Sequence, residues 1–151
     1  MKFLKIIAWL ALVALVVIQF FPIILNESDY VPQSDFMVEN QVPATIKNRL
    51  QVSCYDCHSN NTDYPWYSKI QPAAWFLEDH IQEGKDELNF NEWATYSDRR
   101  KNSKLRSIIS QIEEDKMPLD SYTLIHKDAI LSDEDKRMII DYMTALKDSL
   151  E

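Results

Sequence analysis

The chain has 151 residues, of which 46% are hydrophobic and 11% aromatic, and this composition excludes an intrinsically disordered protein. Gly84 is the only glycine, which argues against glycine-rich phosphate loops and tight β-hairpin turns and favours an all-α fold. The formal net charge of −8 becomes −10 when Lys2 and Lys5, at the start of an apolar segment, are left out. Such a surface repels nucleic acid and favours a basic partner.

The first predicted element is this apolar segment, residues 6–25, with the sequence IIAWLALVALVVIQFFPIIL. Gln19 is its only strongly polar residue. A helix of this length spans about 30 Å, the thickness of the hydrocarbon layer of a bilayer. We therefore expect a single transmembrane anchor, and a cleaved secretory signal is the alternative.

The charges that flank the apolar segment predict its orientation. Lys2 and Lys5 precede it, whereas only acidic side chains follow it before Lys47. Because positively charged flanks stay in the cytoplasm, we expect a single-pass protein of the inner, cytoplasmic membrane. Its domain would face the periplasm or the cell exterior.

The remaining chain divides into a predicted linker, residues 26–41, and one predicted helical domain, residues 42–151. The linker is polar and contains Pro32. The first helix of the domain is expected from apolar residues that recur every fourth position: Val42, Ile46 and Leu50.

Three further helices are predicted in the domain. One begins at Pro72, a residue suited to a first helical turn, and is expected to end at Gly84. Residues 98–114 carry an apolar stripe made of Leu105, Ile108, Ile109 and Ile112. The last helix follows a capping box of Ser132 and Asp135, and its stripe consists of Met138, Ile139, Tyr142, Met143 and Leu146.

The motif Cys54-x-x-Cys57-His58 uses both cysteines of the chain. On a helical turn, two thiols three residues apart can add to the two vinyl groups of a haem, and the adjacent histidine then reaches the iron. A structural zinc site needs four ligands, and only His80 and His126 remain as further histidines. A thioredoxin-like dithiol would follow a strand, whereas the sequence predicts helices.

Two stretches that begin SCYDCHSNN and KMPLDSYTLIH resemble the bacterial haem-binding domain family, whose members are small, membrane-anchored, cytochrome c-like proteins. The resemblance covers roughly residues 40 to 146. It implies a bound haem and a cytochrome c-like helical fold, with Cys54 and Cys57 as attachment points and His58 as the proximal ligand. It leaves the physiological partner open.

Met117 is the predicted sixth ligand of the iron. It lies next to Pro118 between two predicted helices, and in cytochrome c-like folds a methionine in such a loop commonly supplies this ligand; the alternative is a methionine that fills a gap in the core. His80 is the alternative distal ligand. Met138 and Met143 are expected in the core, and His126 in a structural role. We expect five aromatic residues to form the core and the wall of the haem pocket: Tyr64, Trp66, Tyr67, Trp75 and Trp93.

Together these features predict a membrane-anchored c-type cytochrome with one covalently attached haem c. Its iron would be held by His58 and Met117, and it would carry single electrons to an unidentified partner protein rather than act as an enzyme. A haem-based sensor with an open sixth position is the alternative. A thiol–disulfide oxidoreductase is a further alternative.

Overall fold

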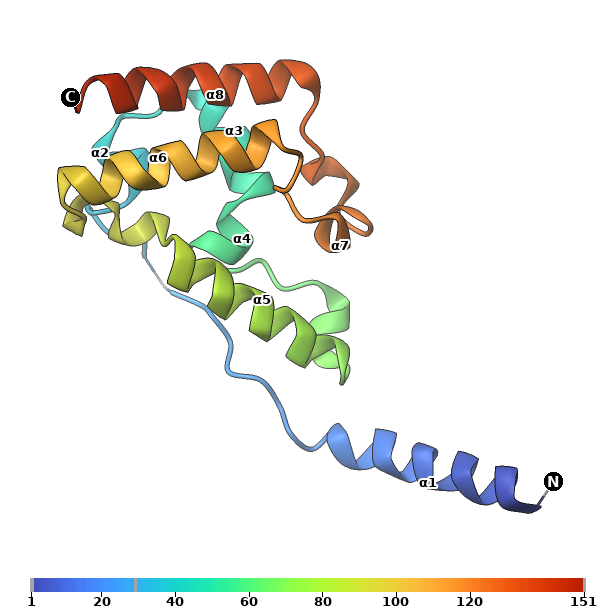
Figure 1. Cartoon of the computed structure of the whole chain (residues 1–151). Helices are drawn as coiled ribbons and strands as arrows, with labels where there is room; N and C mark the ends of the chain where they lie inside the picture. Colours follow the sequence, from blue (N-terminus) through green and yellow to red (C-terminus); the bar gives the residue numbers. More distant parts are fainter. Residues whose placement is uncertain (1, 29, 151) are drawn as a thin grey trace.

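The computed structural model describes residues 2–28 and 30–150, and every regular element in these ranges is helical (Figure 1). The all-α prediction is therefore confirmed. The elements are, in chain order, α1 (Lys2–Ile18), α2 (Phe36–Glu39), α3 (Ala44–Ser53), α4 (Tyr55–His58), η1 (Trp66–Lys69), α5 (Ala73–Glu87), η2 (Phe90–Thr95), α6 (Asp98–Glu113), α7 (Asp120–Thr123), η3 (Lys127–Ala129) and α8 (Asp133–Asp148).

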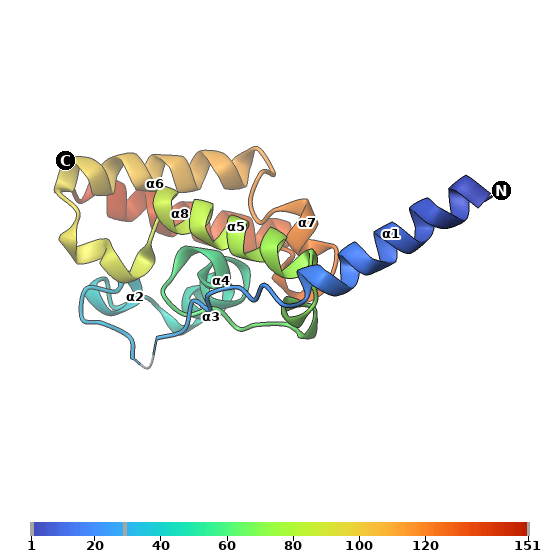
Figure 2. The ribbon, with the colours of Figure 1, turned by 90° about the horizontal axis from the view of Figure 1, so that it is seen from below.

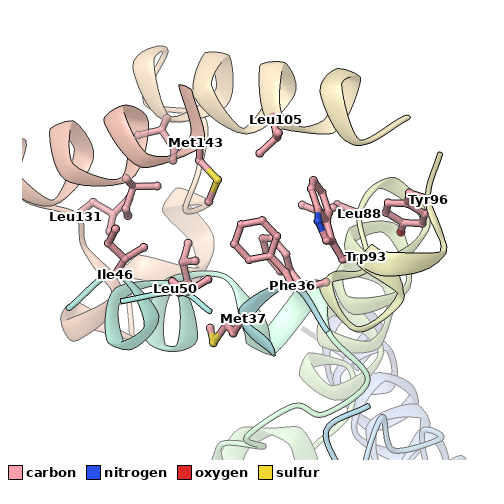
Figure 3. Packing of buried hydrophobic residues seen from close by; sticks show 14 residues of the cluster. Phe36, Met37, Ile46, Leu50, Leu88, Trp93, Tyr96, Leu105, Leu131 and Met143 are labelled. Atoms are coloured by element: carbon pink, nitrogen blue, oxygen red, sulfur yellow. The ribbon is translucent and has the colours of Figure 1, made fainter. Parts of the chain in front are cut away.

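The long helices α6 and α8 run antiparallel to each other and cover α3 (Figure 1). Both helices were predicted with nearly these bounds, because each combines a local start signal with an apolar stripe. Ser97 caps α6, and Ser132 and Asp135 form the predicted capping box of α8. Leu105 and Met143 point from the two helices toward Leu50 and Phe36 in the core (Figure 3).

Two residues of the segment predicted as a linker, residues 26–41, belong to the hydrophobic core: Phe36 and Met37. Phe36 is 0% exposed, and its ring lies 5.3 Å from that of Phe90 and 4.9 Å from that of Trp93. Met37 is buried beside it. The burial of these residues could not be predicted from the sequence pattern, because the single turn α2 is too short to show a helical repeat.

The apolar N-terminal helix also differs from its prediction. Helix α1 ends at Ile18 instead of continuing to Leu25. Gln19 turns away to hydrogen-bond Gln71, and Pro22 disfavours a helical conformation in the residue before it. Within residues 2–28 and 30–150, no helix is both long and apolar enough to cross a membrane, which corrects the expected transmembrane helix. No side chain of α1 is buried.

Residues 19–28, which we call the strap, follow α1 and lie along α5 (Figures 1 and 2). Gln19 Nε2 donates to Gln71 O (3.1 Å), and Gln71 N donates in return to Gln19 Oε1 (3.0 Å). Asn26 is buried at the other end, where its Nδ2 donates to Ser59 O and to Thr62 Oγ1, both at 2.9 Å. The strap is thus bonded to the domain at both ends.

Candidate functional site

The cysteine motif begins where α3 ends. Cys54 separates α3 from the single turn α4, which carries Cys57 and His58. The backbone N–H of His58 donates to Cys54 O (3.0 Å), and this closes the turn. Both thiols are free.

A buried carboxylate fixes this turn from the opposite side. Asp35, 1% exposed, accepts hydrogen bonds from Tyr55 Oη (3.1 Å) and Asn91 Nδ2 (2.8 Å). Burial and the nearby Asp35 raise the pKa of Tyr55, so its hydroxyl stays a donor. The Tyr55 ring stacks on Phe90 with 4.9 Å between the ring centroids. The core segment α2 therefore supports the motif directly.

Helix α5 contacts the motif turn α4 so closely at position 84 that only glycine fits there. A Cβ atom on Gly84 would lie 2.7 Å from Cys57 O and 3.1 Å from Cys57 Cβ. Gly84 was predicted to end α5, but the helix continues to Glu87, and Gly84 O accepts the N–H of Leu88 (2.9 Å). The glycine is thus required for the contact between α4 and α5 rather than for a helix terminus.

This close approach places His58 against the last carbonyl groups of α5. Its Nδ1–H donates to Gly84 O at 2.7 Å and lies 3.0 Å from Leu88 O. The proton is therefore on Nδ1, and Nε2 keeps its lone pair. Burial lowers the pKa of His58, while the two carbonyl groups oppose this effect. A neutral imidazole oriented in this way is the usual arrangement of a metal-ligating histidine.

Two adjoining cavities, of about 320 and 260 Å³, open beside the motif. They share five lining residues: Ser53, Cys54, His58, Glu87 and Met117. The first is otherwise lined by Leu50, Leu88, Phe90, Lys104, Ser107, Ile108, Gln111 and Ile112. The second adds Asp56, Cys57, His80, Glu83, Gly84, Pro118, Leu119 and Tyr122. All the residues predicted to hold a haem thus line one or both cavities.

Met117 reaches both cavities because of the way α6 ends. Asp115 has a positive φ of 55°, and the N–H of Lys116 donates to Gln111 O (2.9 Å). This is a Schellman motif, which turns the chain sharply out of the helix. Met117, which follows this motif, therefore lies across the cavities from α4.

The other predicted candidates lie in different surroundings. His80 lines the second cavity, and its Nδ1–H donates to Phe76 O (2.8 Å). His126 lines neither cavity, because its Nε2 pairs with the hydroxyl of Tyr67 (2.9 Å). Met143 is fully buried in the core, and Met138 is packed against it.

Of the five aromatic residues predicted to form the core and the pocket wall, Trp93 is in the core and none lines either cavity. Trp66 is 74% exposed and Trp75 is 38% exposed, while Trp93 is buried in the core. None of these, nor Tyr64 or Tyr67, lines either cavity. These residues follow no helical repeat, so their burial depends on tertiary contacts. The aromatic residue that lines the first cavity is Phe90, which was not predicted from the sequence.

The two thiols differ from those of a redox-active dithiol. Burial raises the pKa of Cys54 to about 12 and that of Cys57 to about 11, with smaller contributions from neighbouring negative groups. Reactive cysteines have lowered pKa values instead. Among residues 2–28 and 30–150, no group of three or more histidine, cysteine or acidic side chains is arranged to hold a metal ion.

A comparison with known families identifies the chain. The sequence model of the haem-binding domain family matches residues 13–145. The chain belongs to the haem-binding domain family. The match begins within α1 and includes the strap, the motif, both cavities and most of α8. No curated protein and no solved structure matches the chain.

The cavities fit the ligand after which the haem-binding domain family is named. Their walls are largely apolar, and His58 offers a neutral ring nitrogen suited to iron. Ser53 is 7% exposed, and its Oγ is the single buried side-chain polar atom in the described part of the chain without a hydrogen-bond partner. A buried hydroxyl without a partner is costly, and a ligand with polar groups can satisfy it.

We predict that Gly84→Ala weakens both the fold and haem binding. The added methyl group would meet the backbone of Cys57, which cannot rotate away, so α4 and α5 must separate. Overpacking of this kind costs about 1–3 kcal/mol. Denaturant unfolding should show the loss of stability, and Soret absorbance should show less haem per polypeptide. Gln82→Ala, at an exposed position of α5, is the control. Unchanged stability and haem content would show that the close approach is not required.

Proposed function

We propose that this chain is a c-type cytochrome that holds one covalently attached haem and transfers single electrons to a partner protein. The observation that carries the proposal is the pair of hydrogen bonds from His58 Nδ1 to Gly84 O and Leu88 O. They fix the ring and leave Nε2 as a ligand at a cavity that Cys54 and Met117 also line.

Each residue of the motif has a separate role in this proposal. Cys54 and Cys57 form thioether bonds to the vinyl groups of the haem, and His58 provides the proximal nitrogen. When bound, haem supplies a one-electron Fe(III)/Fe(II) couple. The buried, protonated thiols suit attachment by a dedicated maturation system better than rapid thiol–disulfide exchange.

Met117 supplies the sixth ligand. A neutral, polarizable thioether favours the ferrous state and raises the reduction potential relative to a second imidazole. If His58 and Met117 both held the iron, little would have to rearrange when an electron moves, as a carrier requires. The net charge of −10 outside the first residues favours a basic redox partner.

Helix α1 attaches the protein to a membrane. None of its apolar side chains is buried, whereas a helix that is apolar on every side is normally buried in protein or lipid. Lys2 and Lys5, in the first turn of α1, add electrostatic attraction to an anionic lipid surface.

The covalent attachment is tested by Cys54→Ser combined with Cys57→Ser. The unmodified protein, produced with haem-maturation machinery, should keep its haem through acid-organic extraction and denaturing electrophoresis, because thioether bonds survive unfolding. The double variant should lose its haem under the same treatment. Met37→Leu, which changes a sulfur atom outside the site, is the control. Haem that survives extraction from the double variant would contradict the proposal.

The sixth ligand is tested by Met117→Ala. The unmodified ferrous protein should bind carbon monoxide slowly or not at all, since the thioether occupies the iron. The variant should bind the gas at once and show a lower reduction potential. Met138→Ala removes a methionine outside both cavities and serves as the control. Immediate binding by the unmodified protein would favour a haem-based sensor, and a low-spin spectrum that persists in Met117→Ala would point to His80.

Membrane attachment is tested by Leu10→Glu combined with Val13→Glu. Both side chains are exposed on α1, so the domain should fold unchanged. Flotation with liposomes should recover the unmodified chain in the lipid fraction and lose most of the variant. Leu124→Glu combined with Ile130→Glu places the same charges at exposed apolar positions of the domain and should float normally. Equal flotation of all three proteins would rule out α1 as the attachment.

A further inference from the structure

Helix α6 presents a stripe of polar side chains to the first cavity. Lys104, Ser107 and Gln111 occupy positions i, i+3 and i+7, so they share one face of the helix. They lie beside Ile108 and Ile112, which belong to the apolar wall of the same cavity.

Lys104 is the charged member of the stripe, and its ion pair with Glu87 is long. Its side chain is only 21% exposed, and its Nζ lies 3.8 Å from Glu87 Oε2, beyond hydrogen-bond distance. The Glu87 side chain is 87% exposed and therefore well solvated. A carboxylate at this end of the cavity could therefore make a closer, charge-assisted hydrogen bond to Lys104 than Glu87 makes.

The two cavities differ in charge: Lys104 balances the shared Glu87 in the first, whereas no lysine or arginine balances the carboxylates that line the second. Beyond the shared residues, Lys104 is the charged side chain that lines the first cavity. The second cavity instead adds the acidic residues Asp56 and Glu83, and no lysine or arginine is among its lining residues. An elongated ligand with one anionic edge would therefore place that edge in the first cavity.

The attachment points lead independently to the same orientation. In haem, the two vinyl groups and the two propionates lie on opposite edges of the porphyrin. Cys57 lines the second cavity but not the first, while Cys54 lines both. A haem held by both cysteines would therefore turn its vinyl edge toward the second cavity and its propionate edge toward the first.

We propose that Lys104, Ser107 and Gln111 form the binding site for the haem propionates. Lys104 donates a charge-assisted hydrogen bond to a carboxylate, and the hydroxyl of Ser107 and the amide of Gln111 donate further hydrogen bonds. The inference rests on the proposed attachment of haem through Cys54 and Cys57. It goes beyond that proposal because it fixes which edge of the porphyrin meets α6.

The test compares two porphyrins on the full-length chain produced without haem-maturation machinery. Soret titration measures the affinity for haemin and for haemin dimethyl ester, whose esters remove the negative charges. The unmodified chain should bind haemin at least about tenfold more tightly, as expected for one charge-assisted hydrogen bond. Lys104→Gln should reduce this preference severalfold and leave the affinity for the ester unchanged, and the latter result would show that the cavity is intact.

Two matched variants complete the experiment. Lys101→Gln removes the same charge from α6 at a position that lines neither cavity, so the preference for haemin should remain. Lys104→Arg keeps the charge and should also retain the preference. In the haem-loaded protein, resonance Raman spectra should show a shift of the propionate bending modes in Lys104→Gln but not in Lys101→Gln.

The outcomes separate this inference from the proposed function. If the unmodified chain binds neither porphyrin, the proposed function fails. If it binds both with equal affinity, or if Lys104→Gln keeps the full preference for haemin, haem binding stands and the propionate site is wrong. An equal loss of affinity for both porphyrins in Lys104→Gln would also overturn the inference, because Lys104 would then only support the cavity.

Discussion

The contact between α4 and α5 at Gly84 is the constraint on which the site depends. The absent side chain of Gly84 lets the two helices meet backbone to backbone, and the carbonyl of the same residue accepts the Nδ1–H of His58. One residue thus sets both the distance between the helices and the tautomer of the histidine. The second carbonyl, Leu88 O, belongs to the residue that ends α5, so the histidine lies at the negative end of the helix.

This arrangement explains how a short motif turn can hold a rigid position. A single turn such as α4 has too few internal hydrogen bonds to be stable alone. It is held by Gly84 of α5 on one side, and by the bond from Tyr55 to the buried carboxylate of Asp35 on the other. The cavity then forms where α6 passes over this fixed turn, and Met117 follows directly from the end of α6.

The parts of the fold that were predictable are those with local signals. The helices α6 and α8 have caps and apolar stripes, and Cys54, Cys57 and His58 form a motif whose spacing has a chemical meaning. The errors concern features that only tertiary contacts decide. The end of α1 depends on Gln71, far away in the sequence, and the burial of Phe36 depends on Phe90 and Trp93. The polar stripe of α6 could have been found, because Lys104, Ser107 and Gln111 repeat with a helical period.

The strap gives the N-terminal helix a fixed relation to the rest of the protein. A flexible tether would let a domain rotate freely and sample a volume set by the tether's length. Here the reciprocal bonds between Gln19 and Gln71, and the buried Asn26, leave little such freedom. A surface that binds α1 therefore also sets the orientation of the domain and of its cavities relative to that surface. A second protein diffusing along that surface would meet the same edge of the domain at every encounter, and the rate of their reaction would depend on geometry rather than on random reorientation.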